Sequence, residues 1–288
     1  MTSAQHLPMT VKTMTVRGLR LAYADAGGPG APVLALHGHF GRARQFAGLA
    51  AALAPEFRVI ALEQRAHGQS DRDDDLTPDA YTADAAAFVG ELGLGPLPVL
   101  GHSMGGVVGF RLAAHHPELV RSLIVEEGGA LNRRPEVAHP VLDVRDWPCR
   151  APTLGELRRQ VEAHGIPDAG YFLESAVERP DGWGFLFDYE DMVRSQELLV
   201  GDWWPDWLGS TCPALLVHGL DSGILPTPMA RDMAERRPHT TLREFPHCGH
   251  WVHDDAPTQF AAAVREFLTA QTENHSSRVM NALWGSGR

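Results

Sequence analysis

The sequence predicts an α/β protein built on a mostly parallel sheet with helices on both faces. Short apolar runs alternate with segments of helical spacing along most of the 288 residues. Parallel strands are buried on both faces, so they appear as continuous apolar runs and not as alternating ones. The strands are predicted over 19–24, 33–36, 58–62, 97–100, 122–125, 214–217 and 241–245, and the helices over 46–53, 81–92, 107–114, 229–236 and 257–268.

One long segment, residues 131–210, interrupts this alternation. It holds five of the seven tryptophans of the chain. An insertion of this size between two strands is expected to form a helical cap over the active-site end of the sheet, with its aromatic residues divided between its own core and a substrate pocket. We therefore expect a core of residues 1–130 and 211–271, a cap of 131–210 and a flexible tail of 272–288. At least two of the five tryptophans are expected in the pocket wall: Trp147, Trp183, Trp203, Trp204 and Trp207.

The composition of the chain limits which partners and which cellular compartment are expected for the protein. The formal net charge is -11, from 36 acidic and 25 basic residues, which argues against nucleic acid or an anionic membrane as a partner. Three cysteines at unrelated spacings imply no disulfide framework. No run approaches the roughly 18 consecutive apolar residues of a membrane-spanning helix, and the N-terminus lacks the apolar centre of a signal peptide. The sequence thus predicts a cytoplasmic protein with a small-molecule substrate, and it leaves a homodimer open.

The stretch G-H-S-M-G over residues 101–105 carries the strongest chemical signal. It lies between the apolar run 97–100 and the helical segment 107–114, which is the setting of a G-x-S-x-G nucleophile elbow. A strand that turns sharply into a helix lifts the hydroxyl of Ser103 above the sheet. The unpaired N–H groups at the helix start also favour a developing oxyanion. Ser103 is therefore the predicted nucleophile.

A nucleophilic serine needs a base, and His250 is the candidate. It follows the last predicted strand and precedes the closing helix, so it belongs to a loop at the same sheet edge as Ser103. The chain has 15 histidines, and it is this position, after Gly249, that distinguishes His250 from the others. His247 and His253 are expected to be surface residues.

Four motifs in chain order resemble those of the α/β-hydrolase superfamily, in its capped, cofactor-free form. Besides the elbow they are H-G-H-F over 37–40, R-A-H-G-Q-S-D over 65–71 and G-H over 249–250. Ala66 stands where the superfamily usually has a glycine. The resemblance covers roughly residues 15 to 270 and implies an eight-stranded, mostly parallel sheet with a helical cap. It also implies a loop-tying turn or a functional segment at 65–71, and it says little about the substrate.

The resemblance further implies an oxyanion hole formed by the N–H of Met104 and that of His39 or Phe40. Two donors must converge on the carbonyl oxygen as it becomes negative, and each is worth roughly 3–4 kcal/mol of barrier. Aromatic residues near these motifs and in the cap are expected to contact the substrate. The candidates are Phe40, Trp183 and Trp251.

The acid that orients the base departs from the usual pattern. The superfamily normally places an aspartate three residues after the glycine that ends the strand predicted at 214–217, and Ser222 occupies that position here. Haloalkane dehalogenases with a relocated acid, and zearalenone-type lactone hydrolases, carry it instead after the preceding strand, ten residues beyond a proline. Counted from Pro117, that position is Glu127. Glu126 points to the opposite side of the strand, and Asp221 lies one residue before the usual position; both are fallbacks.

A serine, a histidine and a carboxylate with an oxyanion hole predict acyl transfer to water. The expected reaction is cleavage of an ester, a lactone or a carbon–carbon bond of a mid-sized apolar or aromatic substrate, with no metal and no cofactor. Two alternatives stay open on the same fold. In a cofactor-free dioxygenase the histidine would remove a substrate proton before oxygen reacts, and in a ligand receptor the site would bind without turnover.

Overall fold

The centre of the protein is an eight-stranded sheet, seen in a computed structural model that describes the backbone of residues 9–284 and the side chains of residues 9–273. The strand order is β1-β2-β4-β3-β5-β6-β11-β12. β1 pairs with β2, and β2 with β4, in antiparallel fashion, while every other pair is parallel. The mostly parallel eight-stranded sheet is confirmed. Its strands are β1 (Thr10–Val16), β2 (Leu19–Asp25), β3 (Ala31–Leu36), β4 (Phe57–Leu62), β5 (Leu97–His102), β6 (Val120–Glu126), β11 (Ala214–Gly219) and β12 (Thr240–Phe245).

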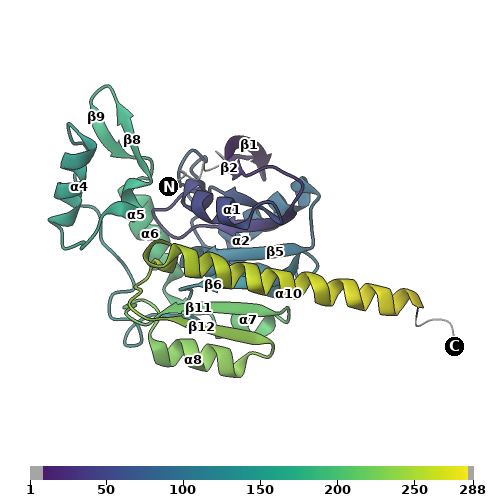
Figure 1. The fold of residues 1–288 in the computed structure, drawn as a ribbon. Coiled ribbons are helices and arrows are strands. Elements are labelled where there is room, and N and C mark those ends of the chain that lie inside the picture. The colour runs from purple at the N-terminus through teal and green to yellow at the C-terminus, as the bar shows by residue number, and fades with distance from the viewer. Residues whose placement is uncertain (1–8, 285–288) are drawn as a thin grey trace, which may run out of the picture.

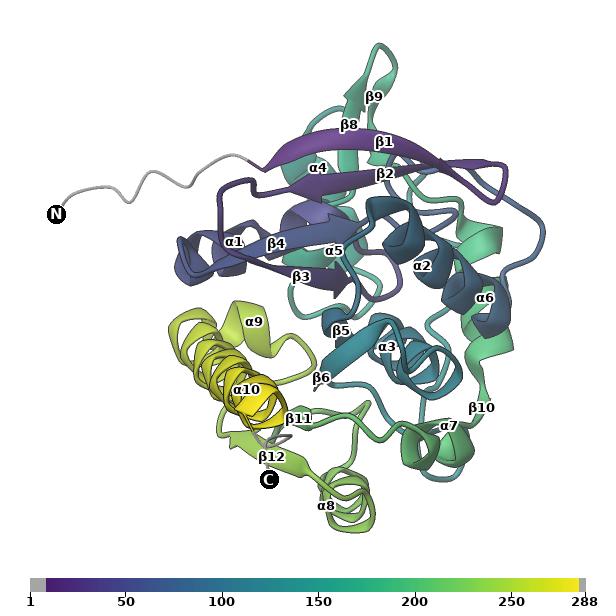
Figure 2. The ribbon, with the colours of Figure 1, turned by 90° about the vertical axis from the view of Figure 1, so that its right-hand side faces the viewer.

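Helices cover both faces of this sheet, as predicted (Figure 2). Successive strand residues point to opposite faces, so Val33 joins one apolar cluster and Leu34 the other. The cluster that holds Val33 packs against α1 (Ala47–Leu53) and α10 (Pro257–Trp284). The cluster that holds Leu34 packs against α2 (Pro78–Leu92), α3 (Met104–His115) and α8 (Thr227–Arg236). The sequence did not predict β1, because this strand lies at the sheet edge, is mostly exposed and contains no apolar run.

The segment 131–210, here called the cap segment, runs from the end of β6 to the start of β11. It contains four helices, α4 (Leu154–Glu162), α5 (Gly170–Leu173), α6 (Tyr189–Leu199) and α7 (Trp204–Gly209). It also contains the hairpin of β8 (Ala176–Arg179) with β9 (Gly182–Phe185), and the short pair of β7 (Leu131–Asn132) with β10 (Gly201–Asp202). Figure 1 shows α4, β8 and β9 extending away from the sheet, with α5 and α6 nearer to it.

The C-terminal helix is longer than the sequence predicts. The expected helix ends at 268 and a flexible tail begins at 272, whereas α10 runs as one helix from Pro257 to Trp284. Figure 1 shows its last turns projecting beyond the sheet. Residues 269–284 contain no glycine or proline, so the polar composition that suggested a tail is compatible with a helix. Residues 285–288 of the expected tail lie outside the described residues.

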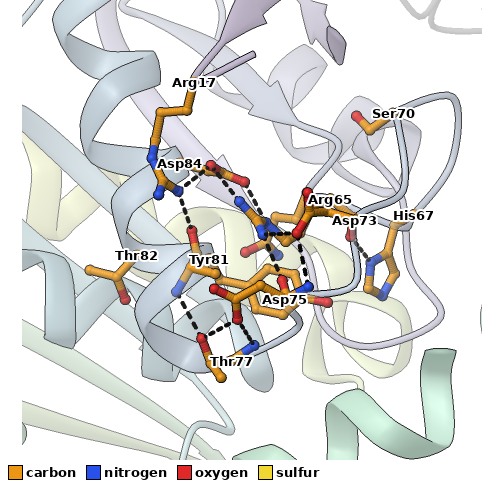
Figure 3. A network of polar contacts seen from close by, with 12 residues as sticks. Arg17, Arg65, His67, Ser70, Asp73, Asp75, Thr77, Tyr81, Thr82 and Asp84 are labelled. Carbon is orange, nitrogen blue, oxygen red and sulfur yellow. Dashed lines mark hydrogen bonds and ion pairs between the residues drawn. The ribbon is translucent and has the colours of Figure 1, made fainter. Parts of the chain in front are cut away.

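The motif at 65–71 ties loops of the core together (Figure 3). Arg65 donates to both carboxylate oxygens of Asp84 at 2.6 and 2.8 Å and to the carbonyl of Asp75 at 2.6 Å. Arg17 donates to the same Asp84 at 2.9 Å. His67 hydrogen-bonds through Nδ1 to the carbonyl of Arg65, and none of these residues lines the active-site cavity described below. The geometry favours the loop-tying interpretation of this motif.

Candidate active site

The serine of the elbow stands at a strained turn between β5 and α3. Ser103 has φ 53° and ψ −119°, a left-handed conformation that side chains rarely adopt. A Cβ at Gly101 would collide with the carbonyl of Gly105, and a Cβ at Gly105 would collide with that of Leu36. Only glycine fits where the strand and the helix approach so closely, which explains the spacing of the motif. Ser103 lines a cavity at the carboxyl edge of the sheet.

His250 lines the same cavity as Ser103. It lies on the loop between β12 and α9 (Val252–Asp255), at the sheet edge where the elbow also lies. His102, next to Ser103, hydrogen-bonds through Nε2 to the carbonyl of His250 at 2.9 Å. This contact ties the loop that carries the candidate base to the turn that carries the candidate nucleophile.

Glu127 is the carboxylate that the structure brings to His250. Its Oε2 lies 3.3 Å from the Nδ1 of His250. The same carboxylate accepts hydrogen bonds from the Nδ1 of His218 at 2.9 Å, from the amide of Gly219 at 2.8 Å and from the hydroxyl of Ser222 at 2.5 Å. Glu127 is 1% exposed and, like Ser103, has a positive φ, 57°. It follows directly on β6, where the count from Pro117 places the relocated acid.

The contacts of Glu127 keep it ionised. Burial by itself raises the pKa of this carboxyl group, but the hydrogen bonds from His218, His250 and Ser222 and the charge of His250 outweigh it, so the net pKa is lowered from 4.5. A carboxylate that stays charged at neutral pH is suited to hold one tautomer of an imidazole and to stabilise its protonated form.

Neither fallback acid contacts His250. Glu126 accepts instead from the Nδ1 of His253 at 2.8 Å and from the backbone amide of His253 at 2.8 Å. Asp221 is exposed, and its amide donates to the carbonyl of Cys248. His253, predicted as a surface residue, is buried against Glu126, because a buried carboxylate requires donors.

Sequence reasoning missed two residues that hold Glu127. His218 was not singled out, although a histidine at the end of a fully buried strand is a signal that its imidazole has polar partners. Its Nε2 hydrogen-bonds to the hydroxyl of Thr227 at 2.9 Å, so both ring nitrogens are satisfied. Ser222 was noted only as the residue that replaces the usual acid, whereas its hydroxyl contacts the relocated one.

The candidate oxyanion donors face the same cavity. Met104 is the first residue of α3, so its N–H has no acceptor within the helix, and both Met104 and His39 line the cavity beside Ser103. The turn that carries His39 is closed by a hydrogen bond from the amide of Gly41 to the carbonyl of Gly38 at 3.2 Å. Phe40 also lines the cavity and has φ 66°.

The cavity has a volume of about 360 Å³ and mostly apolar walls. Core loops and the cap segment both contribute to it. Two of the predicted substrate contacts, Phe40 and Trp251, are among its lining residues. The cap segment contributes Leu131, Asn132, His139, Pro140, Val141, Leu142, Ile166, Pro167, Tyr171, Phe172, Gln196 and Leu199.

The prediction for the cap tryptophans is wrong, because none of the five lines this cavity. Trp183 exchanges backbone hydrogen bonds with Ala151 and borders a separate surface hollow. Trp147 and Trp207 are buried in the protein interior, and Trp203 and Trp204 pack against the guanidinium groups of Arg111 and Arg236. Large rings stabilise a small inserted segment most when they fill its own core and its seam with the sheet.

No arginine or lysine is among the lining residues of this cavity, all of which the structure describes. Among all the residues that the structure describes, no group of three or more histidine, cysteine, aspartate or glutamate side chains is arranged to hold a metal ion. Across residues 9–284, no helix is both long and apolar enough to cross a membrane.

Comparison with known proteins identifies the family of the chain. The family model described as the alpha/beta hydrolase family matches residues 33–263. The chain belongs to this family. It is 26% identical to an sn-1-specific diacylglycerol lipase from Danio rerio over 90% of this chain and 85% of the relative. It is 31% identical to a putative carbamate hydrolase from Caulobacter sp. (strain K31) over 76% of this chain and 84% of the relative.

Solved structures share the fold. The crystal structure of E-2-(acetamidomethylene)succinate hydrolase superposes with a TM-score of 0.78 at 22% identity, over 91% of this chain and 99% of that one. The family and these hydrolase relatives show that the protein is an α/β-hydrolase enzyme.

Proposed function

We propose that the protein is a serine hydrolase that cleaves an ester, a lactone or a carbon–carbon bond of a neutral, mid-sized apolar substrate through an acyl-enzyme. The observation that carries the proposal is the shared cavity of Ser103 and His250, with the Nδ1 of His250 on a buried carboxylate. This is the arrangement that activates a serine hydroxyl.

In this mechanism His250 takes the proton of Ser103 as the hydroxyl attacks the substrate carbonyl. Glu127 holds the imidazole with its hydrogen on Nδ1, which leaves Nε2 free to accept that proton. The N–H groups of Met104 and of His39 or Phe40 stabilise the oxyanion. His250 then returns the proton to the leaving group, and water, activated by the same imidazole, releases the acyl group.

The cavity walls support the substrate class. Ligand pockets span about 300–1,000 Å³, so a cavity of about 360 Å³ suits a small to mid-sized molecule. With no arginine or lysine in its walls, a carboxylate on the substrate would be desolvated without a permanently charged cationic partner. A neutral substrate avoids this cost. The diacylglycerol lipase among the relatives has a name that also fits an uncharged acyl substrate.

The test is the substitution Ser103→Ala, followed with a fluorophosphonate probe and with p-nitrophenyl esters of increasing chain length. We expect wild-type protein to form a stoichiometric adduct at Ser103 and to release p-nitrophenol, and the variant to do neither. An unchanged rate of ester turnover in the variant would contradict the proposal. Oxygen consumption with N-heteroaromatic ring compounds, retained in the variant, would instead favour the dioxygenase alternative.

A further inference from the structure

The cap segment holds the loop that carries one of the two oxyanion donors. This loop, residues 37–41, is called the oxyanion loop below. Three cap side chains form hydrogen bonds with it. The hydroxyl of Tyr171 donates to the carbonyl of His39 at 3.0 Å, and the hydroxyl of Ser175 donates to the carbonyl of Phe40 at 2.5 Å. The hydroxyl of Ser195 lies 3.0 Å from the Nε2 of His39.

Aromatic packing adds contacts from three further cap side chains. The ring of Phe40 meets Phe172 and Phe187 edge-on, with centroids 5.3 Å away in each case, and stacks on Trp147 at 6.3 Å. Phe40 is 5% exposed. A side chain of the oxyanion loop is thus part of the aromatic core of the cap, so the loop and the cap cannot move independently without separating these rings.

The backbone of the oxyanion loop requires such support. Phe40 has φ 66°, and a bulky residue in the left-handed region persists only where its surroundings hold it there. The carbonyl of Gly38 is held within the loop, by the amide of Gly41 at 3.2 Å and by the Nδ1 of His37 at 2.8 Å. The next two carbonyls, those of His39 and Phe40, are the ones that the cap supplies with donors.

The direction of an N–H follows from that of the carbonyl in the same peptide plane. Because the peptide unit is planar, a hydrogen bond to the carbonyl of His39 also fixes the N–H of Phe40. Burial raises the pKa of Tyr171, so its hydroxyl stays protonated and remains a donor to this carbonyl. Ser175 fixes the following plane, whose N–H belongs to Gly41 and donates to the carbonyl of Gly38 at 3.2 Å. The carbonyl of Gly38 shares its plane with the N–H of His39, so Ser175 supports that donor through Gly41. Ser175 is 0% exposed, so water cannot replace it.

The Ser195 contact joins three elements. The hydroxyl of Ser195, on α6, lies 3.0 Å from the hydroxyl of Tyr81, on α2, as well as 3.0 Å from His39. Burial and the nearby His67 and His250 lower the pKa of His39 well below 6.5, so its imidazole is neutral and its Nε2 can accept from the serine hydroxyl. The side chain of His39 is thereby fixed to the cap as well.

We infer that the cap segment positions the oxyanion hole, with Tyr171 and Ser175 as the positioning residues. This inference rests on the proposed function, because it assumes that residues 39 and 40 supply an oxyanion donor. Removal of either hydroxyl leaves Ser103, His250 and Glu127 in place and loosens only the donor, so stabilisation of the transition state weakens more than binding of the ground state.

Ser175→Ala is the first test, with p-nitrophenyl butyrate as substrate. A loosened oxyanion donor should lower kcat by about 10- to 100-fold with KM changed less than about threefold, since loss of one whole donor costs about 10²–10³. An alkyl trifluoromethyl ketone, which forms an oxyanion adduct with the serine, should bind more weakly by a similar factor. The matching methyl ketone, which forms no stable adduct, should bind as it does to wild type.

Ser210→Ala is the matched control. Ser210 is equally buried within the cap segment. Its hydroxyl donates to the carbonyl of Trp207 and accepts from the Nε of Arg237, and neither partner belongs to the oxyanion loop. The Ser210→Ala variant also loses one buried hydroxyl group, and it should keep kcat and both inhibitor constants within about threefold of the wild-type values. If the Ser175 variant does not fold, Tyr171→Phe, which keeps the ring in the cavity wall, takes its place with the same expectations.

The outcomes separate the inference from the proposed function. If Ser103→Ala is inactive but the Ser175 and Tyr171 variants keep wild-type kcat and wild-type affinity for the trifluoromethyl ketone, the inference is wrong and the serine hydrolase stands. Equal weakening of both ketones would also overturn it, because a general structural loss does not discriminate between them. If Ser103→Ala keeps ester turnover, the proposed function itself is wrong.

Discussion

Glu126 and Glu127 are neighbours at the end of β6, and each holds its own histidine in a different setting. Glu127 faces the cavity and contacts His250. Glu126 points the other way and binds His253 through two contacts to its Nδ1, at 2.8 and 3.0 Å, and one to its amide. Neither Glu126 nor His253 lines the cavity.

The electrostatics of the two pairs differ as well. Burial lowers the pKa of His253, but the charge and the hydrogen bonds of Glu126 outweigh it, so the net pKa is raised from 6.5. His253 and Glu126 thus form a buried ion pair. Glu127 divides its oxygens among two imidazoles, an amide and a hydroxyl. A carboxylate–imidazole contact alone therefore does not make a catalytic pair; access to the cavity of the serine distinguishes the Glu127–His250 pair from the Glu126–His253 pair.

Glu127→Gln gives the largest expected effect on activity. Without the carboxylate, the tautomer and the charge of His250 are no longer supported, and kcat for p-nitrophenyl butyrate should fall on the order of 10⁴-fold. Circular dichroism and the thermal midpoint check that the variant is folded. A folded variant that keeps more than about a tenth of wild-type turnover would show that Glu127 does not orient the base.

A second carboxylate, introduced at the usual acid position, should recover part of this loss. The hydroxyl of Ser222 lies 2.5 Å from the Oε2 of Glu127, the oxygen that reaches His250. In the double variant Glu127→Gln with Ser222→Asp, the introduced carboxylate would lie close to the position that the Glu127 carboxylate occupies in wild type. We expect kcat at least about 10-fold above that of Glu127→Gln, because the base again has an acceptor for its Nδ1–H. The single variant Ser222→Asp is the control, and no recovery would place the Ser222 loop outside reach of His250.

Glu126→Gln should affect stability more than activity. A hydrogen bond between charged groups contributes about 1.5–3 kcal/mol, so the free energy of unfolding should fall by about that amount. The raised pKa of His253 sets the pH dependence of this stabilisation. The ion pair contributes fully to the free energy of unfolding below pH 6.5, and its contribution is lost as the pH rises through the raised pKa of His253. Urea unfolding of both proteins across this range measures the difference. A stability gap that grows with pH would contradict the ion pair.

Asp221→Asn should give the smallest effect. Asp221 is exposed, lies outside the cavity walls and has no contact with His250. We expect kcat and KM within about twofold of wild type, as for surface substitutions that break no buried contact. A large loss of kcat would restore Asp221 as a candidate for the orienting acid.

Local pattern was enough to predict seven of the eight strands of the sheet and the elbow at Ser103, whereas Glu127 was predicted from the resemblance to hydrolases with a relocated acid. Strand period and motif spacing report directly on which residues share an edge of the sheet. The positions of the cap tryptophans could not be predicted in the same way, because these residues follow no period and their burial depends on packing against Phe40 and Phe110. The donors to Glu127 could not be predicted either, since His218 and Ser222 come close to it only through the pairing of β6 with β11.

The rate at which a fluorophosphonate modifies Ser103 tests most directly whether Glu127 orients His250, because it reports the nucleophilicity of the serine without knowledge of the substrate. The measurement compares second-order rate constants for wild type, Glu127→Gln and Glu126→Gln under identical conditions. We predict a fall of at least about 10²-fold for Glu127→Gln, since the base loses its orienting acid, and a change of less than about threefold for Glu126→Gln. Equal rates for the two variants, or a larger fall for Glu126→Gln, would show that Glu127 does not orient the base.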